Sequence, residues 1–234
     1  MNLITDIYAL NEKSITIVFG DEISLALADR ISAFNQILHT NPFPGLITTV
    51  PAYASLTVHY DPIKVYRSDL KGNTCIQKVS DYIKSLKITE TQNNAPRNRI
   101  TIPVYYGGEF GPDIEVVAAH ANLSTAEVIQ LHSTATYLVH LIGFVPGFAY
   151  MGGLNKRLST PRRKQPRAKV PAGAVGIAGE QTGIYPLDIP GGWQIIGQTP
   201  FKLFDPNRSV PALLKAGDEV VFQSITLDHY QSLL

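Results

Sequence analysis

One short basic segment has the residue types and spacing best suited to bind a ligand. Residues 128–179 contain no Asp or Glu but seven Lys or Arg residues. Within them, the segment PRRKQPR (161–167) brings Arg162, Arg163 and Arg167 close together, and its two prolines stiffen the backbone. Planar guanidinium groups bind the oxygen atoms of carboxylates or phosphates in pairs. We interpret this segment as an anion-binding loop; the alternative is a solvated charged surface.

Turns rich in glycine and aromatic residues flank the basic segment. Residues 141–200 contain 11 of the 18 glycines and the only tryptophan. Such turns expose backbone N–H groups beside aromatic rings, as the rims of small-ligand pockets do. Tight turns that pack aromatic rings in a core are the alternative. On the first interpretation the rim consists of Gly143, Phe144, Pro146, Gly147, Phe148, Gly191, Gly192 and Trp193. The neutral polar groups that would orient a ligand beside this rim are Gln181, Thr182 and Tyr185.

Other kinds of catalytic site are not indicated. The chain has no GxxxxGK[ST] loop for ATP phosphates, no G-x-S-x-G motif and no HExxH motif. His132 and His140 have no acidic residue near them in the sequence, so we expect no metal site. Cys75 is the only cysteine, which excludes an intramolecular disulfide, and we interpret it as a small buried hydrophobic residue. We assign no catalytic residue from the sequence.

The first 90 residues predict a small α+β domain. Strands are expected at 4–10, 14–19, 46–50 and 53–60, and amphipathic helices at about 23–38 and 73–87. This β-β-α-β-β-α order is typical of a small α/β sandwich, which we describe as ferredoxin-like, with its helices on one face of the sheet. No residue in this domain indicates chemistry, and we interpret His39 and His59 as structural or surface residues.

A polar linker at 91–99 is expected to join this domain to a second one at 100–234. In the second domain, Ser124 and Glu127 form the pattern of a capping box and predict a helix that runs to about His132. A further short helix is expected at 113–121. The strands are expected at 100–106, 136–142, 175–178, 193–197, 200–204 and 219–225, before a C-terminal docking helix. Short strands separated by Gly/Pro turns favour a closed β-barrel.

The composition excludes several classes of function. The net charge of +1 gives no reason to expect binding to nucleic acid or to an acidic membrane. The chain begins without a basic flank followed by an apolar run, so no signal peptide is indicated. It also lacks an uninterrupted apolar stretch of about 18 residues, the length needed to cross a bilayer. We therefore expect a soluble, cytoplasmic protein.

Four sequence blocks resemble a known family. GFVPGFAYMGGL, TPRRKQPRAKVPAG, VGIAGEQTGIYP and PGGWQIIGQTP are similar, in order and spacing, to the signature blocks of the KipI / allophanate hydrolase subunit 1 family. The resemblance extends over essentially the whole chain. It implies an α/β N-terminal domain and a cyclophilin-like β-barrel. The chain departs from the family pattern at Ala174 and Ile189, where serine is usual.

The resemblance also implies a function. The commonest bacterial members are described as the B subunit of an ATP-dependent 5-oxoprolinase, which converts 5-oxoproline to glutamate together with a carboxyltransferase-like C subunit and an A subunit. ATP would then act at the level of the complex, with none bound by this chain alone, and the lone chain would be inactive. One alternative is an inhibitor of a sporulation histidine kinase, with Phe144, Phe148 and Trp193 exposed for that partner. A second is one component of an allophanate or urea-amide hydrolase.

Overall fold

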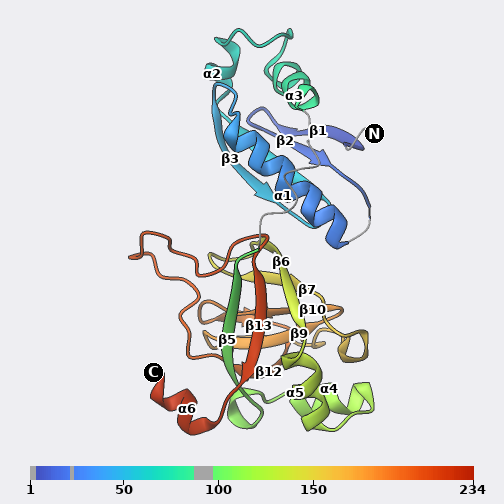
Figure 1. Cartoon of the computed structure of the whole chain (residues 1–234), viewed down its shortest axis with the longest axis vertical. Helices are drawn as coiled ribbons and strands as arrows, with labels where there is room; N and C mark the ends of the chain where they lie inside the picture. Colours follow the sequence, from blue (N-terminus) through green and yellow to red (C-terminus); the bar gives the residue numbers. More distant parts are fainter. Residues whose placement is uncertain (1–3, 22–23, 87–96) are drawn as a thin grey trace. The chain divides into compact units, whose positions relative to one another are not determined.

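The computed structural model describes residues 4–21, 24–86 and 97–234, and the chain divides into two compact units, Met1–Pro96 and Arg97–Leu234. In Figure 1 the first unit is an antiparallel sheet with helices packed against it, and the second is a β-barrel. Most of the linker expected at 91–99 lies outside the described residues, as does Ile23 at the expected start of the first helix.

The first unit contains two β-hairpins joined by a helix. Its strands are β1 (Asp6–Asn11), β2 (Ser14–Val18), β3 (Leu46–Pro51) and β4 (Ser55–Tyr60), and its helices are α1 (Leu25–Thr40), α2 (Pro62–Tyr66) and α3 (Cys75–Ser85). The strands are antiparallel, in the order β1-β2-β4-β3. Period-two alternation turns Leu56, Val58 and Tyr60 of β4 into a hydrophobic core shared with α1 and α3.

Side chains at the helix starts explain where these helices begin. Ser24 accepts a hydrogen bond from the Leu27 N–H at the start of α1, and Thr74 does the same for Gln77 at the start of α3. Such caps satisfy N–H groups that have no partner within the helix. The short helix α2 was not expected. Asp61 caps it and Pro62 occupies its first turn, where a missing N–H carries no penalty.

The second unit is a closed seven-stranded barrel. Its strand order is β10-β7-β6-β13-β5-β12-β9, and β9 pairs with β10 to close it. The barrel strands are β5 (Arg99–Tyr106), β6 (Thr136–Ile142), β7 (Ala149–Gly152), β9 (Ala174–Ala178), β10 (Gln181–Ile184), β12 (Gln194–Gln198) and β13 (Glu219–Ser224). The expected α+β class and closed barrel are confirmed, and the barrel is consistent with the cyclophilin-like fold.

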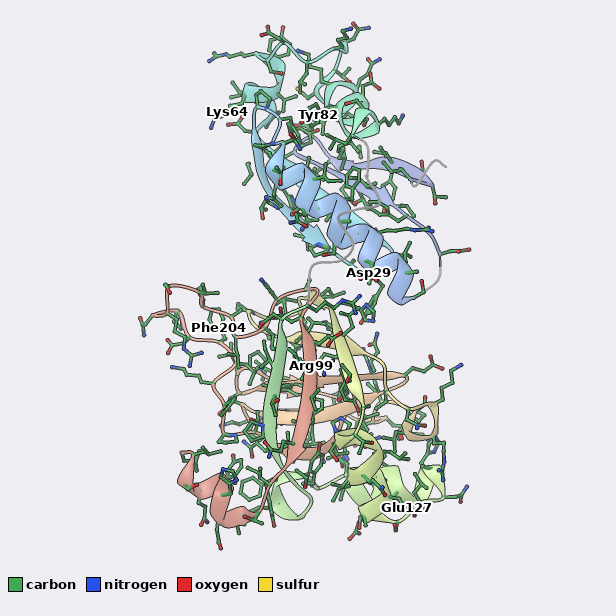
Figure 2. The ribbon with its side chains drawn as sticks, viewed as in Figure 1. Asp29, Lys64, Tyr82, Arg99, Glu127 and Phe204 are labelled. Atoms are coloured by element: carbon green, nitrogen blue, oxygen red, sulfur yellow. The ribbon has the colours of Figure 1, made fainter. Side chains whose placement is uncertain are left out.

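Strands β5 and β13 run parallel and are tied together at their starts. Figure 2 labels Arg99 on β5, and its guanidinium donates two hydrogen bonds to Glu219 of β13, the shorter at 2.8 Å. The hydrogen bond from Arg99 is the main reason why the pKa of Glu219 is lowered. Among the described residues, this is the only pair of barrel strands that runs parallel, so the ion pair joins two strands that no tight turn connects.

Helices α4 (Ile114–Ala121) and α5 (Thr125–Ser133) lie together at one end of the barrel in Figure 1. The expected capping box is present: the Ser124 hydroxyl accepts from the Glu127 N–H, and the Glu127 carboxylate accepts from the Ser124 N–H at 2.8 Å. The backbone N–H of Ser124 and its hydroxyl both donate to the Glu127 carboxylate, and these two hydrogen bonds lower its pKa. A last helix, α6 (Leu227–Ser232), follows β13. No helix within the described ranges is long and apolar enough to cross a membrane.

One expected strand is wrong and several short ones were not expected. Residues 200–204 form no strand; Phe204 makes only an isolated bridge to Ala212, because β12 already pairs with β5 and β9 on its two sides. The unexpected elements include β7 and β10, which pair with each other, and a separate two-stranded ribbon. That ribbon consists of β8 (Arg167–Val170) and β11 (Ile189–Gly191).

Candidate functional site

Three segments that are distant in the sequence meet at one region of the second unit. The backbone N–H of Arg163 in the basic loop donates to the Gly192 carbonyl at 2.7 Å. The side-chain amide of Gln194 donates to the Pro161 carbonyl at 2.9 Å. The turn at 143–148 joins them through Phe148, whose ring contacts Trp193 at a centroid distance of 5.4 Å. The basic loop and both aromatic turns are therefore neighbours.

An aromatic cluster fills the space between these segments. Phe148 lies at its centre, with ring centroids 4.7 Å from Tyr150, 5.2 Å from Tyr185 and 5.4 Å from Trp193. Phe148 and Trp193 are only 1% and 5% exposed, so the expectation that both are exposed to a protein partner is wrong. Edge-to-face packing of this kind stabilises a core and holds the turns that carry the rings.

Phe144 differs from the rest of the cluster because it is 66% exposed and strained. Its φ is +69°, and the Val145 N–H donates to the Gly143 carbonyl at 2.8 Å, which makes Phe144 the central residue of a γ-turn with positive φ. This is a rare and strained conformation for a non-glycine residue. Its ring packs edge-on against Phe148, with centroids 5.8 Å apart. The turn thus presents an aromatic ring at a fixed position.

Two glycines keep this region compact. Gly147 has a φ of +82°, and a Cβ there would lie 2.8 Å from the Cβ of Phe204, which Figure 2 labels in the long loop after β12. A Cβ on Gly191 would collide with the Tyr185 hydroxyl. That hydroxyl is hydrogen bonded to the Trp193 backbone, and burial is the main cause of its raised pKa. These glycines are therefore required for close packing.

A buried carboxylate takes up two of the three arginines. Asp113 is 2% exposed and accepts from Arg163 Nη1 at 2.8 Å and from Arg167 Nη1 and Nη2 at 2.8 and 2.7 Å. A fourth hydrogen bond comes from the Ile195 N–H of β12 at 2.7 Å. Each carboxylate oxygen accepts two hydrogen bonds, the full capacity of an ionised carboxyl group. Arg163 and Arg167 thus point inward, toward Asp113.

Arg162 is the exposed member of the three. Its positive charge acts on the hydroxyls of Tyr150 and Tyr185, whose pKa values it lowers slightly against the larger raising effect of burial. Within the described ranges no carboxylate lies at ion-pair distance from Arg162. Arg162 therefore remains available to an incoming anion beside the aromatic cluster.

Thr182 belongs to a buried polar chain inside the barrel. Its hydroxyl donates to the Gly176 carbonyl at 3.0 Å, so it must accept from His132 Nε2–H at 2.9 Å. His132 Nδ1 then accepts from the Tyr106 hydroxyl at 2.8 Å. Burial lowers the pKa of His132 to about 3, which keeps the ring neutral. Because Thr182 is fully buried and both partners are internal, it no longer qualifies as a ligand-orienting group.

The remaining rim residues provide backbone and surface positions. Gly143 and Gly192 are half-buried, and Pro146 is exposed beside Phe144. Gln181 is half-buried on β10, opposite Ala178 of β9. In the part of the chain that the structure describes, no three His, Cys, Asp or Glu side chains are close enough to bind a metal ion.

Asp113 is the residue that sequence reasoning missed. We interpreted it as the beginning of a helix, and it does immediately precede α4, although its side chain makes no capping hydrogen bond. It lies 50 residues before Arg163 in the sequence, and no local motif connects the two. The one available signal was the acid-free segment 128–179, whose inward-facing cations must find a carboxylate elsewhere.

Comparisons with known proteins agree with this architecture. The family model of the carboxyltransferase domain, subdomain C and D, matches residues 5–214. The B subunit of 5-oxoprolinase from Bacillus subtilis (strain 168) is 43% identical over 226 residues, which are 95% of this chain and 94% of that relative.

Two solved structures extend the comparison to larger proteins. The crystal structure of TTHA0988 matches with a TM-score of 0.77 and 36% identity, covering 92% of this chain and 40% of that chain. The urea amidolyase of K. lactis matches with a TM-score of 0.72 at 16% identity, covering 99% of this chain and 16% of that chain, and shares the fold. Both matches lie within polypeptides longer than this chain.

Proposed function

The chain belongs to the family of the carboxyltransferase domain, subdomain C and D, and from this premise we propose that it is the B subunit of an ATP-dependent 5-oxoprolinase. The complex would open 5-oxoproline to glutamate. The observation that carries the proposal is the 43% identity to the B subunit of a 5-oxoprolinase over nearly the full length of both chains.

The companion subunits would supply what this chain does not. The sequence contains no phosphate-binding loop of the GxxxxGK[ST] type, so ATP would bind to a partner. Similar chains occur within longer polypeptides, including TTHA0988, where the corresponding segment adjoins further sequence. We propose that a carboxyltransferase-like C subunit and an A subunit take that place here, and that the lone chain is inactive.

The substrate would bind at Arg162 and the neighbouring aromatic cluster. 5-Oxoproline carries one carboxylate on a five-membered lactam ring. Arg162 would bind that carboxylate with two hydrogen bonds, and the exposed ring of Phe144 would cover one face of the lactam. Fixed positive charge in a closed site also stabilises the negative charge that develops as an amide bond is broken. The partner subunit would close the site and exclude water.

A reconstituted complex tests the proposal. The chain is co-expressed with the companion subunits, and glutamate formation is measured with 5-oxoproline and ATP. Arg162→Ala is expected to lower kcat/KM at least about tenfold, the loss of one charged hydrogen-bonded contact. Arg157→Ala, which removes an exposed arginine outside the basic loop, is the matched control and should leave the rate unchanged. Equal rates for both variants in an intact complex would contradict the role of Arg162, and no activity in the unaltered complex would contradict the function.

Inhibition of a histidine kinase is the second candidate, and one observation favours it. Phe144 is a rigid, exposed aromatic residue, as protein-binding hot spots often are. Phe148 and Trp193 no longer support this candidate because both are buried. Capture of a purified histidine kinase by the wild-type chain, lost in Phe144→Ala, would support inhibition. No capture would leave the role in 5-oxoprolinase as the better interpretation.

A further inference from the structure

We propose that Asp113 is the positioning residue of the anion site, because it orients the basic loop and sets the charge that the loop presents. The identity of the ligand rests on the proposed function, whereas the role of Asp113 rests on the geometry alone. Asp113 itself is buried, and protein donors fill both acceptor positions of each carboxylate oxygen, so any effect on a ligand must pass through the arginines.

The hydrogen bonds of Asp113 fix the loop at both of its ends. Arg167 donates from two nitrogens in the parallel arrangement that best fits a carboxylate, and Arg163 adds a third bond from the start of the loop. The Asp113 backbone N–H donates to the Ile195 carbonyl, and the Ile195 N–H returns to the side chain. The loop is therefore attached to β12. Arg162 directly precedes the anchored Arg163, and its charge acts on Tyr150 and Tyr185 of the aromatic cluster.

The cluster is also unbalanced in charge. Two guanidinium groups share one carboxylate, and both arginines stay ionised at any physiological pH. Asp113 is the only carboxylate of the described residues that forms an ion pair with either of them. One positive charge is thus left over in side chains that are only 35% and 24% exposed. Together with Arg162, this surplus favours a ligand carboxylate on the outer side of the cluster.

Chemical rescue with formate tests the proposal without any enzyme assay. Asp113→Ala leaves two guanidinium groups and the Ile195 N–H facing a space that a carboxylate has vacated. Formate is a free carboxylate of that size, so it should raise the Tm of Asp113→Ala at constant ionic strength while leaving the wild-type Tm unchanged. Asp218→Ala is the matched control, because Asp218 is equally buried in the same unit but accepts from the Lys215 N–H and from no arginine.

The reconstituted complex then separates positioning from a merely structural role. Asp113→Ala should raise the KM for 5-oxoproline at least about tenfold while kcat changes little, and formate should restore the KM. A structural role alone would lower the active fraction and leave the KM unchanged. Asp113→Asn, which keeps the size of the side chain and loses its charge, should show the same rise in KM without rescue by formate.

Several results would overturn the proposal. These are an equal effect of formate on Asp113→Ala and Asp218→Ala, an unchanged KM in both Asp113 variants, or failure of both Asp113 variants to fold while Asp218→Ala folds. If formate rescues the Tm but the unaltered complex has no 5-oxoprolinase activity, the proposed function fails and the role of Asp113 in organising the loop stands.

Discussion

Two buried polar assemblies lie in the second unit, and they differ in how their hydrogen bonds and charges balance. In the chain Tyr106–His132–Thr182, each donor meets one acceptor, the chain ends on the Gly176 carbonyl, and the histidine is neutral. In the cluster around Asp113, all three side chains are charged and one positive charge remains uncompensated. The charges of the first assembly are balanced, whereas the second has a net positive charge that an anion would balance.

This difference separates a structural device from a functional one. A satisfied neutral chain contributes to a unique packing of the core and needs no partner. An unbalanced charged cluster near the surface contributes less to stability, because the free-energy cost of desolvating the charges offsets much of their mutual attraction. It is therefore expected where a ligand supplies the missing charge. Substitutions in the two assemblies should therefore change the free energy of unfolding by different amounts.

His132→Ala should be the most destabilising change, by about 3 to 5 kcal/mol. It leaves the Tyr106 and Thr182 hydroxyls without their buried partner and opens a cavity among Tyr137 and Phe222, whose rings lie 5.2 and 4.5 Å from the imidazole centroid. Urea unfolding measures the effect. His120→Ala, at an exposed position on α4, is the control and should change stability by less than about 0.5 kcal/mol. Equal losses of stability in the two variants would show that the hydrogen bonds of Tyr106, His132 and Thr182 contribute little to stability.

Acidification should destabilise the wild-type protein through His132. The folded pKa is lowered from 6.5 to about 3, so the unfolded chain binds a proton more readily than the folded chain between these values. Stability is full above pH 6.5 and should fall by up to about 1.4 kcal/mol per pH unit as the pH drops below it. His140, whose pKa is also lowered by burial, acts in the same direction.

The comparison of wild type with His132→Gln isolates this effect. Glutamine can both accept and donate a hydrogen bond in the same space but does not titrate. Between pH 6.5 and about 4.5 most carboxylates stay ionised, so the wild-type stability should fall more steeply than that of the variant there. Parallel curves over this range would show that His132 does not titrate as proposed.

The two arginines of the charged cluster should differ from each other. Arg167→Gln removes two hydrogen bonds to Asp113 and should cost about 2 to 3 kcal/mol. Arg163→Gln removes one bond and leaves a balanced pair, so it should cost only about 1 kcal/mol. Thermal unfolding of both variants measures the difference. A larger loss for Arg163→Gln would contradict the view that Arg167, with its two hydrogen bonds, is the main partner of Asp113.

Arg162→Ala should have the smallest effect on stability, within about 0.5 kcal/mol. Its side chain is exposed and forms no ion pair with a described carboxylate. Unfolding of this variant in the same series provides the measurement. A loss above about 1 kcal/mol would indicate a structural role and would weaken the proposal that Arg162 binds the substrate.

Local features of the fold were predictable because their causes lie within a few residues. Ser124 and Glu127 are three residues apart and close the same hydrogen-bonded box that their spacing predicts. The strand β7 was missed because its four residues gain stability from pairing with β6 and with β10, some thirty residues later, rather than from their own pattern. The strand expected at 200–204 has suitable alternation, but β12 and β13, the barrel strands before and after it in the sequence, already have partners on both edges.

The candidate site was predictable in part, for the same reason. The basic loop and aromatic turns do come together, yet the direction in which each arginine points depends on Asp113 and could not be read from 161–167. The exposure of aromatic residues was equally inaccessible. Phe144 and Phe148 are four residues apart, but only the backbone turn at Phe144 decides that one ring is exposed and the other buried.

Trp193 provides an intrinsic fluorescence probe of the second unit. It is the only tryptophan of the chain, and it packs against Phe148, Tyr150 and Tyr185 beside the basic loop. Indole emission therefore reports on this region of the second unit and is silent about the first. Intrinsic fluorescence can follow the melting of the barrel, and the arrival of a ligand or partner at its loops, without any attached label.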